Sequence, residues 1–504
     1  MIRGWTGKRL RIDLSLQKAW SEDIDQADLN QWFGGRGLNA FFFSQQLQSP
    51  VSPSSPENPI AFAVGPLTGT LAPCSGWTSI ASFSPLSNPP GYAFTRMPGH
   101  FGAQLKWAGF DQCILQGKAD RPVYLLIEGG MVKFETAGSL WGKETTETAV
   151  ALQEEKGDRS MEILCIGPAG EKQVPFANVI HRLSWTGDHL GLGYLFGVKQ
   201  LKAIAIRGKK PVTLHDSRRF LNLCLNLKDH IQKDRKISRL KEEGTFSLIG
   251  QDGEIMRKTE GRWFPSGSDK QWTAAYRKSY FSGKEGCFSC PVHCGRITQH
   301  PESYFGGIHL GKAWALGPQI GVYDWEWTLK LHRFCQAQGL DPFATGSLLA
   351  LIMKGIEDRS CSEEGLDHIY DLLESGEKAY AILHWILNGG GDKFRLEIPP
   401  AFGNEDLDVL GDIISFCPLV VNRLNSMTVS NIIDLVYAAT AYSLSEREPK
   451  NIVSNILQME SLLQNKEAFR NDASSRARLV DYPINEILIK EERNRESIGY
   501  EDAS

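Results

Sequence analysis

The 504-residue chain lacks several features that would assign it to a common protein class. No apolar run is long enough to span a bilayer, and the first residues, 1-MIRGWTGKRLRIDL-14, contain no apolar segment of a secretory signal. The formal net charge is only −4, which gives no electrostatic basis for binding nucleic acid. We therefore expect a cytoplasmic protein that binds neither a membrane nor nucleic acid.

Internal repeats, heptads and low-complexity tracts are also absent from the sequence. The length exceeds what one hydrophobic core ordinarily supports, so two or three domains are expected. In the first part of the chain, short segments rich in Val and Ile and bounded by Gly, Pro or Asn predict strands. They are 8–14, 59–64, 77–83, 112–117, 122–128, 162–167 and 201–208. Helices are predicted between them at 101–109 and 145–157.

Helical periodicity dominates after Pro211. It covers 213–235, 324–338, 345–358, 376–388, 406–441 and 450–465. The pattern predicts an α+β protein in which a β-rich domain, 1–211, precedes a helical domain, 212–398. A second and shorter helical domain, 399–504, is expected after a boundary near 398-IPPAFGNED-406.

Ten cysteines in a reducing compartment do not predict a disulfide framework. Six of them are scattered singly, and we expect each to be a small buried side chain. These six are Cys74, Cys113, Cys165, Cys224, Cys335 and Cys361.

The segment 287-CFSCPVHC-294 places three cysteines within eight positions and predicts a metal site. Zinc usually takes two separated pairs of ligands, and a second pair is lacking. A [4Fe–4S] cluster suits the pattern better, because one tight loop can bind three corners of the cluster while a distant cysteine binds the fourth. Zinc and three structural thiols are the alternatives. Cys417, which follows an apolar run predicted to be helical and precedes a proline, is a candidate fourth ligand, although spacing alone does not select it over Cys335.

Four histidines are candidates for proton transfer: His100, His181, His189 and His309. A single histidine without an identified partner is more often a surface or hydrogen-bonded residue. His309 is the weak candidate of most interest, because it lies two residues before Gly311, a position that is interpreted below.

The chain resembles the tungsten-containing aldehyde:ferredoxin oxidoreductases along most of its length. The resemblance rests on a collinear set of motifs. They are 4-GWTGKRLRIDLS-15, 34-GGRGLNA-40, 57-ENPIAFAVGPLTGTLAP-73, 99-GHFGAQLKWAGFDQCILQGKADRPVYLLI-127, 166-IGPAGEKQVPFANV-179, 191-GLGYLFGVKQLKAIAIRG-208, 287-CFSCPVHCGR-296, 314-WALGPQIG-321, 339-GLD-341 and 412-DIISFC-417.

The resemblance implies a β-rich platform for a tungstopterin (or molybdopterin), in either case with Mg, followed by mainly helical domains. It implies that aldehyde is oxidised to carboxylate and that electrons leave through a [4Fe–4S] cluster. Cys287, Cys290 and Cys294 would then bind this cluster, and the motif that ends at Cys417 would supply the fourth ligand. Asp341 and Asp412 would lie at the pterins. A ferredoxin or another electron-transfer protein would be the partner, and the chain could form homo- or hetero-oligomers with a related subunit.

The sequence departs from the family at positions that carry chemistry. The glutamate beside tungsten corresponds to Gly311, which cannot transfer a proton. An arginine that links pterin and cluster corresponds to Trp77. An asparagine near the pterin phosphates corresponds to Arg96, which could bind a phosphate directly. In the phosphate loop, Asp188 adds an unfavourable charge.

Gly191 and Gly193 of that same loop remain candidate cofactor contacts, and a close-packed turn is the alternative interpretation. The segment 386–411 passes almost directly between two motifs that the family separates widely, so a histidine and part of the second pterin site are missing. Two hypotheses follow: a working oxidoreductase with an altered metal site, or a non-catalytic subunit or scaffold that carries a cluster.

Overall fold

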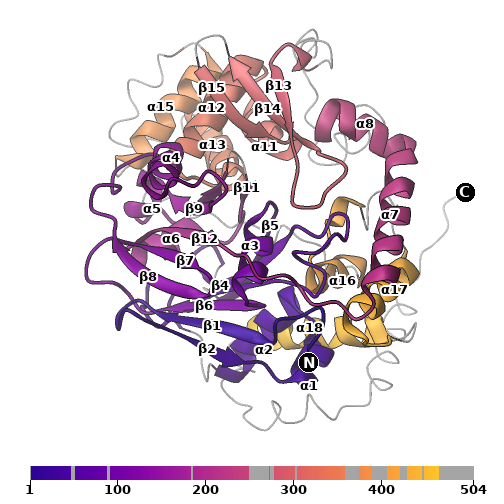
Figure 1. Ribbon diagram of the computed structural model, residues 1–504. Helices are drawn as coiled ribbons and strands as arrows, with labels where there is room; N and C mark the ends of the chain where they lie inside the picture. Colours follow the sequence, from indigo (N-terminus) through magenta and orange to yellow (C-terminus); the bar gives the residue numbers. More distant parts are fainter. Residues whose placement is uncertain are drawn as a thin grey trace, which may run out of the picture.

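The computed structural model describes residues 2–46, 51–87, 91–182, 185–248, 272, 277–300, 303–357, 372, 374–388, 406–420, 428–444 and 448–464. The first part of the chain forms two six-stranded sheets, and most of the helices lie above and beside them (Figure 1). The α+β class predicted from the sequence is confirmed.

The first sheet has the strand order β2-β1-β6-β3-β4-β5. Its strands are β1 (Lys8–Asp13), β2 (Lys18–Asp23), β3 (Ile60–Ala63), β4 (Thr78–Ser84), β5 (Gly91–Met97) and β6 (Gln112–Gln116). Strands β1 and β6 are parallel, and the other neighbours are antiparallel. Alternate residues of β3 enter different hydrophobic clusters, as the two-residue period of a strand requires, so this sheet is buried on both faces.

The second sheet has the order β11-β10-β9-β12-β7-β8. Its strands are β7 (Val123–Glu128), β8 (Met131–Thr136), β9 (Glu162–Ile166), β10 (Val179–His181), β11 (Trp185–Thr186) and β12 (Leu201–Arg207). One face shares a core with the first sheet, α3 (Phe101–Ala108) and α6 (Leu192–Val198). The other face packs against α4 (Thr145–Lys156), which begins with a capping box between Glu144 and Glu147 and ends at Gly157.

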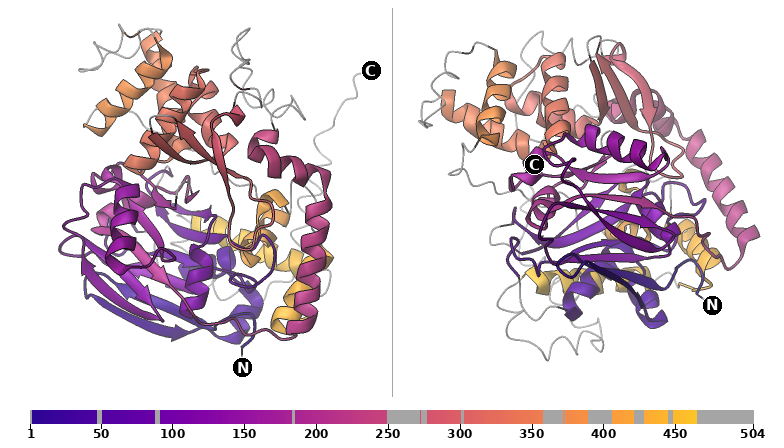
Figure 2. Two further views of the ribbon diagram at one scale, coloured as in Figure 1. Left: turned by 45° about the horizontal axis from the view of Figure 1, so that its top comes forward. Right: turned by 60° about the vertical axis from the view of Figure 1, so that its left-hand side comes forward.

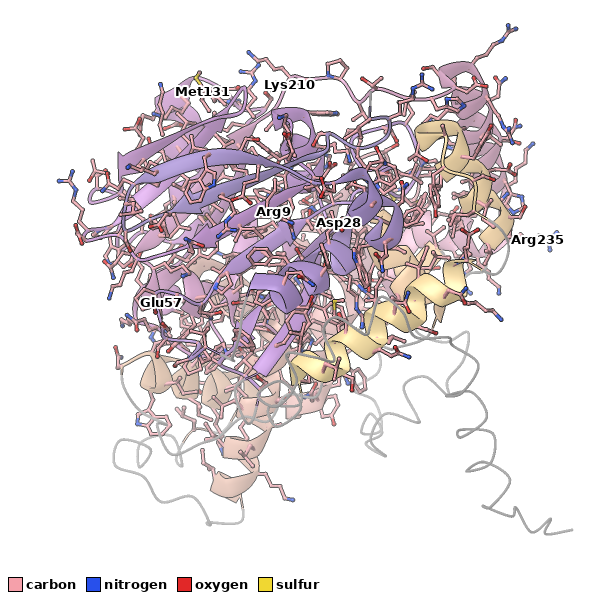
Figure 3. All side chains as sticks on the ribbon, turned by 90° about the horizontal axis from the view of Figure 1, so that it is seen from below. Arg9, Asp28, Glu57, Met131, Lys210 and Arg235 are labelled. Atoms are coloured by element: carbon pink, nitrogen blue, oxygen red, sulfur yellow. The ribbon has the colours of Figure 1, made fainter. Side chains whose placement is uncertain are left out.

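Helices from the two ends of the chain cover the far face of the first sheet. They are α1 (Gln26–Trp32), α2 (Gly35–Gln46), α16 (Asp406–Ile414), α17 (Val429–Thr440) and α18 (Glu448–Gln464), and their side chains enter one hydrophobic cluster. Seen from below, Arg9 of β1 lies close to Asp28 of α1 (Figure 3), and each affects the pKa of the other. The domain boundaries predicted from the sequence stay predictions.

The middle of the chain forms a layer beside the sheets (Figure 2). Its helices are α7 (Ser217–Lys233), α8 (Arg235–Glu243), α11 (Leu310–Ala315), α12 (Trp325–Gln338), α13 (Pro342–Glu357) and α15 (Ser375–Leu387), and α12, α13 and α15 share a core. This part also contains a sheet of β13 (Phe281–Glu285), β14 (Gly295–His300) and β15 (Ser303–Ile308), which the sequence analysis missed.

All seven strands predicted from the sequence are present within one or two residues of their expected bounds. The helical stretch predicted over 406–441 is wrong as a continuous element. Helix α16 ends at Ile414, and Ser415 has a φ of +64°, which breaks the helix just before Pro418. Helix α17 begins only at Val429.

Candidate metal centre

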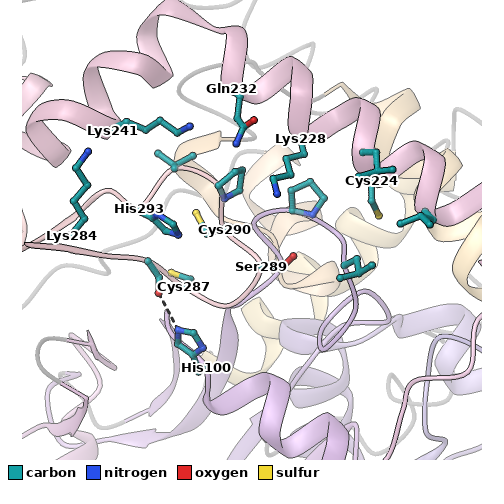
Figure 4. Close-up of a pocket in the computed structure, with 17 residues that line it drawn as sticks. His100, Cys224, Lys228, Gln232, Lys241, Lys284, Cys287, Ser289, Cys290 and His293 are labelled. Carbon is teal, nitrogen blue, oxygen red and sulfur yellow. Dashed lines mark hydrogen bonds between the residues drawn. The ribbon is translucent and has the colours of Figure 1, made fainter. Parts of the chain in front are cut away.

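The three closely spaced cysteines lie in the loop that joins β13 to β14, and Figure 4 shows two of them, Cys287 and Cys290. Main-chain hydrogen bonds hold this loop against the first sheet: Phe288 N–H donates to Gly99 O over 2.9 Å, and Cys74 N–H donates to Ser289 O over 3.1 Å. Gly76 permits this close approach, because a Cβ there would lie 2.8 Å from Phe288 N. The β-rich part of the chain therefore supports the cysteine loop directly.

Cys417 lies in the turn after α16, whereas the sequence predicts that a helix over 406–441 runs through it. Its N–H donates to Cys74 O over 2.9 Å. Ser415 O accepts from Trp77 N–H over 3.3 Å, and the Ser415 hydroxyl accepts from Gly65 N–H over 2.8 Å. The Cys417 turn is thus joined to the same N-terminal loop that contacts the cysteine loop.

The thiols of Cys287, Cys290, Cys294 and Cys417 lie close enough to affect one another electrostatically. Burial and then the charges of the other three raise the pKa of Cys287 well above its usual value, and burial followed by the charge of Cys290 raises that of Cys417 to about 12. A hydrogen bond from Cys74 is the main cause that lowers the pKa of Cys290 to about 7.

Cys74 is buried, as expected. Nothing in the sequence indicated its neighbours: its Sγ lies 3.9 Å from Cys290 Sγ, and Cys417 is a further cause, after Cys290 and burial, that raises its pKa. Cys113, Cys165, Cys224 and Cys335 are buried as expected, whereas Cys361 lies outside the described residues. Cys335 packs in the core of α12, α13 and α15, away from these thiols.

This set of donors fits an iron–sulfur cluster. Four thiols from two segments face one region, and thiolates are the usual protein ligands of such clusters. The Trp77 indole N–H adds a donor. It is buried without a hydrogen-bond partner among the described residues, and it lies near enough to Cys417 to oppose slightly the rise that burial causes in the pKa of that thiol. Within the described ranges, no three Cys, His, Asp or Glu side chains are grouped tightly enough to hold a single metal ion.

Arg96 and Asp412, both expected at a pterin, form an ion pair with each other. The Arg96 guanidinium contacts both carboxylate oxygens, with Nη2 at 2.9 Å from Oδ2. Arg36 donates to the same carboxylate over 3.2 Å and to Glu460 over 2.6 Å. Burial raises the pKa of Asp412 even though two arginines oppose the shift. Both residues therefore have partners within the protein, and their contact with a pterin stays a prediction.

The other expected cofactor contacts also have structural partners. Asp341 accepts hydrogen bonds from the N–H groups of His189, at 2.5 Å, Phe343 and Ala344. Gly193 is packed so tightly that a Cβ would lie 2.5 Å from Asn178 N, and Gly191 has a φ of +69°. Helix α6, which they begin, has only seven residues. The close-packed turn considered for these glycines is therefore present, and their contact with a cofactor stays a prediction.

His181 and His100 connect the second sheet to the cysteine loop. His181 Nδ1 bonds to Ile163 O over 3.1 Å, so Nε2 can accept from His100 N–H over 3.2 Å. The His100 ring then reaches Gly286 O over 3.0 Å, next to Cys287. Burial lowers the pKa of His181 to about 4, so its ring is neutral near pH 7. These two residues position the loop.

His309 lies behind the cysteine loop, where its ring packs 5.1 Å from Trp185. Its Nε2 is buried and, like Trp185 Nε1, has no hydrogen-bond partner among the described residues. Burial lowers the pKa of His309 to about 3. At Gly311, a Cβ would lie 3.1 Å from the Phe343 ring, so Phe343 packs where a longer side chain would begin.

His332 of α12 is a residue that the sequence analysis missed. It is 1% exposed, and neither ring nitrogen has a partner in the described part of the chain. Burial, followed by the charges of Lys312 and His309, lowers its pKa to about 3. The helical period of α12 gives no sign of this, because a buried histidine and a buried apolar residue occupy the same positions of the pattern.

No described helix has the length and apolarity needed to cross a membrane.

Comparison with known families matches residues 9–208 to the N-terminal domain of aldehyde ferredoxin oxidoreductase and residues 223–392 to domains 2 and 3 of the same family. The chain is 35% identical over 369 residues to the tungsten-containing aldehyde ferredoxin oxidoreductase of Pyrococcus abyssi, and this match covers 72% of the chain and 60% of the relative. It is 27% identical over 421 residues to the aliphatic sulfonate oxidoreductase, WOR-like subunit, of Pyrococcus furiosus, covering 77% and 65%.

Among solved structures, a chain of the active site complex BamBC of benzoyl coenzyme A reductase with 1,5-dienoyl-CoA superposes with a TM-score of 0.77 at 18% identity. The match covers 95% of this chain and 94% of that one, and it shows a shared fold.

In the sequence comparison, by contrast, the chain spans about 60% of the length of the curated aldehyde ferredoxin oxidoreductase relatives that it matches.

Proposed function

Because the chain belongs to the aldehyde ferredoxin oxidoreductase family, we propose that it is an iron–sulfur oxidoreductase with a [4Fe–4S] cluster bound by Cys287, Cys290, Cys294 and Cys417. The observation that carries the proposal is the convergence of these four thiols from two segments far apart in sequence. When bound, such a cluster takes up and releases one electron at a time.

The chain's own residues would hold and shield this site. The hydrogen bonds of Phe288 and Cys417 fix the two ligand segments on the β-rich part of the chain. The buried indole N–H of Trp77 is available as a donor to a cluster sulfur. Hydrogen bonds of this kind tune the reduction potentials of clusters.

Oxidation of an aldehyde or a related substrate at a tungstopterin (or molybdopterin), in either case with Mg, is the second part of the proposal. Its support is the tungsten-containing aldehyde ferredoxin oxidoreductases among the relatives. Arg96, Asp341, Asp412, Gly191 and Gly193 remain the candidate contacts. Since Arg96 and Asp412 are paired with each other, no chemical step is assigned to them.

A specific observation favours the alternative, a non-catalytic subunit that carries a cluster. Gly311 offers no carboxylate, and the Phe343 ring packs against it. One relative is itself named as a subunit, and the structural neighbour comes from a two-protein complex, so assembly with a related chain is part of this alternative. Under both the oxidoreductase proposal and this alternative, a ferredoxin partner and a cytoplasmic location stay predictions.

Metal and pterin analysis of protein purified without oxygen distinguishes the pterin-containing oxidoreductase from the non-catalytic subunit. Tungsten or molybdenum at one per chain, with released pterin, would support the enzyme. A cluster without heavy metal or pterin would support the alternative. Protein without iron would reject both.

A further inference from the structure

A hollow of about 680 Å³ opens directly over the cysteine loop (Figure 4). Cys287 and Cys290 line its floor together with Pro291 and His293. Leu71 of the N-terminal loop and residues of helices α7 and α8 also line it. The candidate cluster site therefore reaches the molecular surface at this place.

Helix α7 presents two separate stripes. Phe220, Cys224, Leu227 and Ile231 are buried at the spacing of one helical face. Leu221, Leu225, Lys228 and Gln232 repeat the same spacing one residue further on, and they line the hollow. Leu221 and Leu225 are 41% and 54% exposed, and Leu71, which also lines the hollow, is 64% exposed. Exposed apolar side chains gathered around one hollow are typical of a protein contact.

Three lysines surround this apolar centre: Lys228 of α7, Lys241 of α8 and Lys284 of β13. None of them forms an ion pair with any residue in the described parts of the chain, and no aspartate or glutamate lines the hollow. The whole chain carries a net charge of −4, so this local positive charge is not a general property of its surface. Figure 4 shows Lys228 reaching from α7 toward the loop, with Lys241 and Lys284 at the other end.

We propose that the lysine-rimmed hollow, formed by Lys228, Lys241, Lys284, Leu71, Leu221 and Leu225, docks an acidic electron-transfer protein over Cys287 and Cys290. This inference rests on the proposed function, because docking here matters only if the cysteines hold a cluster. The apolar centre and the charged rim match the anatomy of a protein interface. Charge complementarity selects an acidic partner and steers it to the site. One electron would leave this chain and reduce the docked protein by one electron.

The test is the affinity of the holoprotein for a purified ferredoxin of strongly negative net charge, measured by calorimetry at low and high salt. We expect reversal of all three lysines (K228E/K241E/K284E) to weaken binding at low salt by at least about tenfold, because rim charges govern steering. Salt above about 0.5 M should weaken the binding of ferredoxin to the wild type and narrow the difference in affinity between the wild type and the triple variant, because salt screens exposed charges.

Lys18, Lys118 and Lys133 provide a matched control, since they are exposed and lie outside the hollow, in the β-rich part of the chain. Reversing these three (K18E/K118E/K133E) makes the same change in total charge and should leave binding unchanged. L221N/L225N should weaken binding at both salt concentrations, because it removes apolar area rather than charge. A basic c-type cytochrome should not bind.

Equal affinities in the two triple variants, no binding by the wild type, or self-association through this face in sedimentation would overturn the docking inference. The iron content and the absorption spectrum of each sample distinguish a failure of the docking inference from a failure of the proposed function. A cluster with no lysine-dependent binding rejects the docking surface alone, whereas protein without iron rejects the proposed function whatever it binds.

Discussion

Cys74 Sγ lies 3.9 Å from Cys290 Sγ, although 216 positions separate the two residues in the sequence. Cys74 also binds both ligand segments through its main chain, with its N–H donating to Ser289 and its carbonyl accepting from Cys417. Its φ of +66° is uncommon for a residue other than glycine, and strained backbone gathers at functional sites. Five thiols therefore share a site for which the sequence alone predicts four.

Replacement of Cys74 and of Cys290 should have different effects on the iron content. The hydrogen bond to Cys290, followed by burial and the charges of the neighbouring thiols, raises the pKa of Cys74 well above its usual value, so it stays protonated and can donate to Cys290. We expect Cys74→Ser to keep the iron of the wild type and Cys290→Ala to lose it. Cys113→Ala, at a buried cysteine elsewhere, is the control. Loss of iron in Cys74→Ser would show that Cys74 is itself a ligand.

Trp77→Phe should lower the reduction potential of the cluster without removing iron. The substitution keeps an aromatic ring but deletes the N–H that lies near Cys417. A lost donor destabilises the reduced and more negative state, so the shift should be to lower potential. A redox titration followed by EPR measures it. An unchanged potential would contradict a hydrogen bond from Trp77 to the site.

Arg96→Ala should destabilise the fold strongly. The buried Arg96–Asp412 pair joins β5 to α16, and removing one partner of a buried pair costs about 3–5 kcal/mol. Arg219→Ala breaks an ion pair with Asp434 in which both side chains are more than 40% exposed, and it should cost about 0–1 kcal/mol. Denaturant unfolding compares the two. Similar small losses would mean that the buried pair does not join these elements.

Stability should fall as the pH falls from about 6.5 toward 3, and His332 should be one cause. Its pKa is about 3 in the folded protein, so between these values the unfolded chain binds the proton more readily. The slope for one such histidine is at most about 1.4 kcal/mol per pH unit. Unfolding of His332→Gln over this pH range should give a shallower slope than that of the exposed control His230→Gln. Identical slopes would contradict the assignment.

Much of the fold is predictable from the sequence because its signals are local. The strands β6, β9 and β12 are dense in branched apolar residues between turn residues, and the capping pattern around Glu144 marks the start of α4. Strands β13 and β14 were missed because 281-FSGKE-285 and 295-GRITQH-300 alternate weakly and contain glycine and charged residues. Such strands form because their neighbours in the sheet pair with them, which no short window records.

Some residues of the candidate site can likewise be predicted from local sequence, whereas others depend on packing between distant segments. Cys287, Cys290 and Cys294 were found because spacing within one loop is visible in the sequence. Cys74 was missed because its relation to Cys290 depends on the packing of a distant loop. A signal was available, since Cys74 lies in the Gly- and Pro-rich segment 65–76, a composition that allows the backbone to approach a ligand. The pairing of Arg96 with Asp412 was invisible for the same reason, because each residue was interpreted alone.

The most direct test of the account is the iron and sulfide content of protein purified without oxygen, together with its EPR spectrum after reduction with dithionite. The account predicts about four irons and four sulfides per chain, as a [4Fe–4S] cluster requires, and a signal from a cluster reduced by one electron. Stoichiometric zinc without sulfide, or protein that contains neither metal, would contradict it.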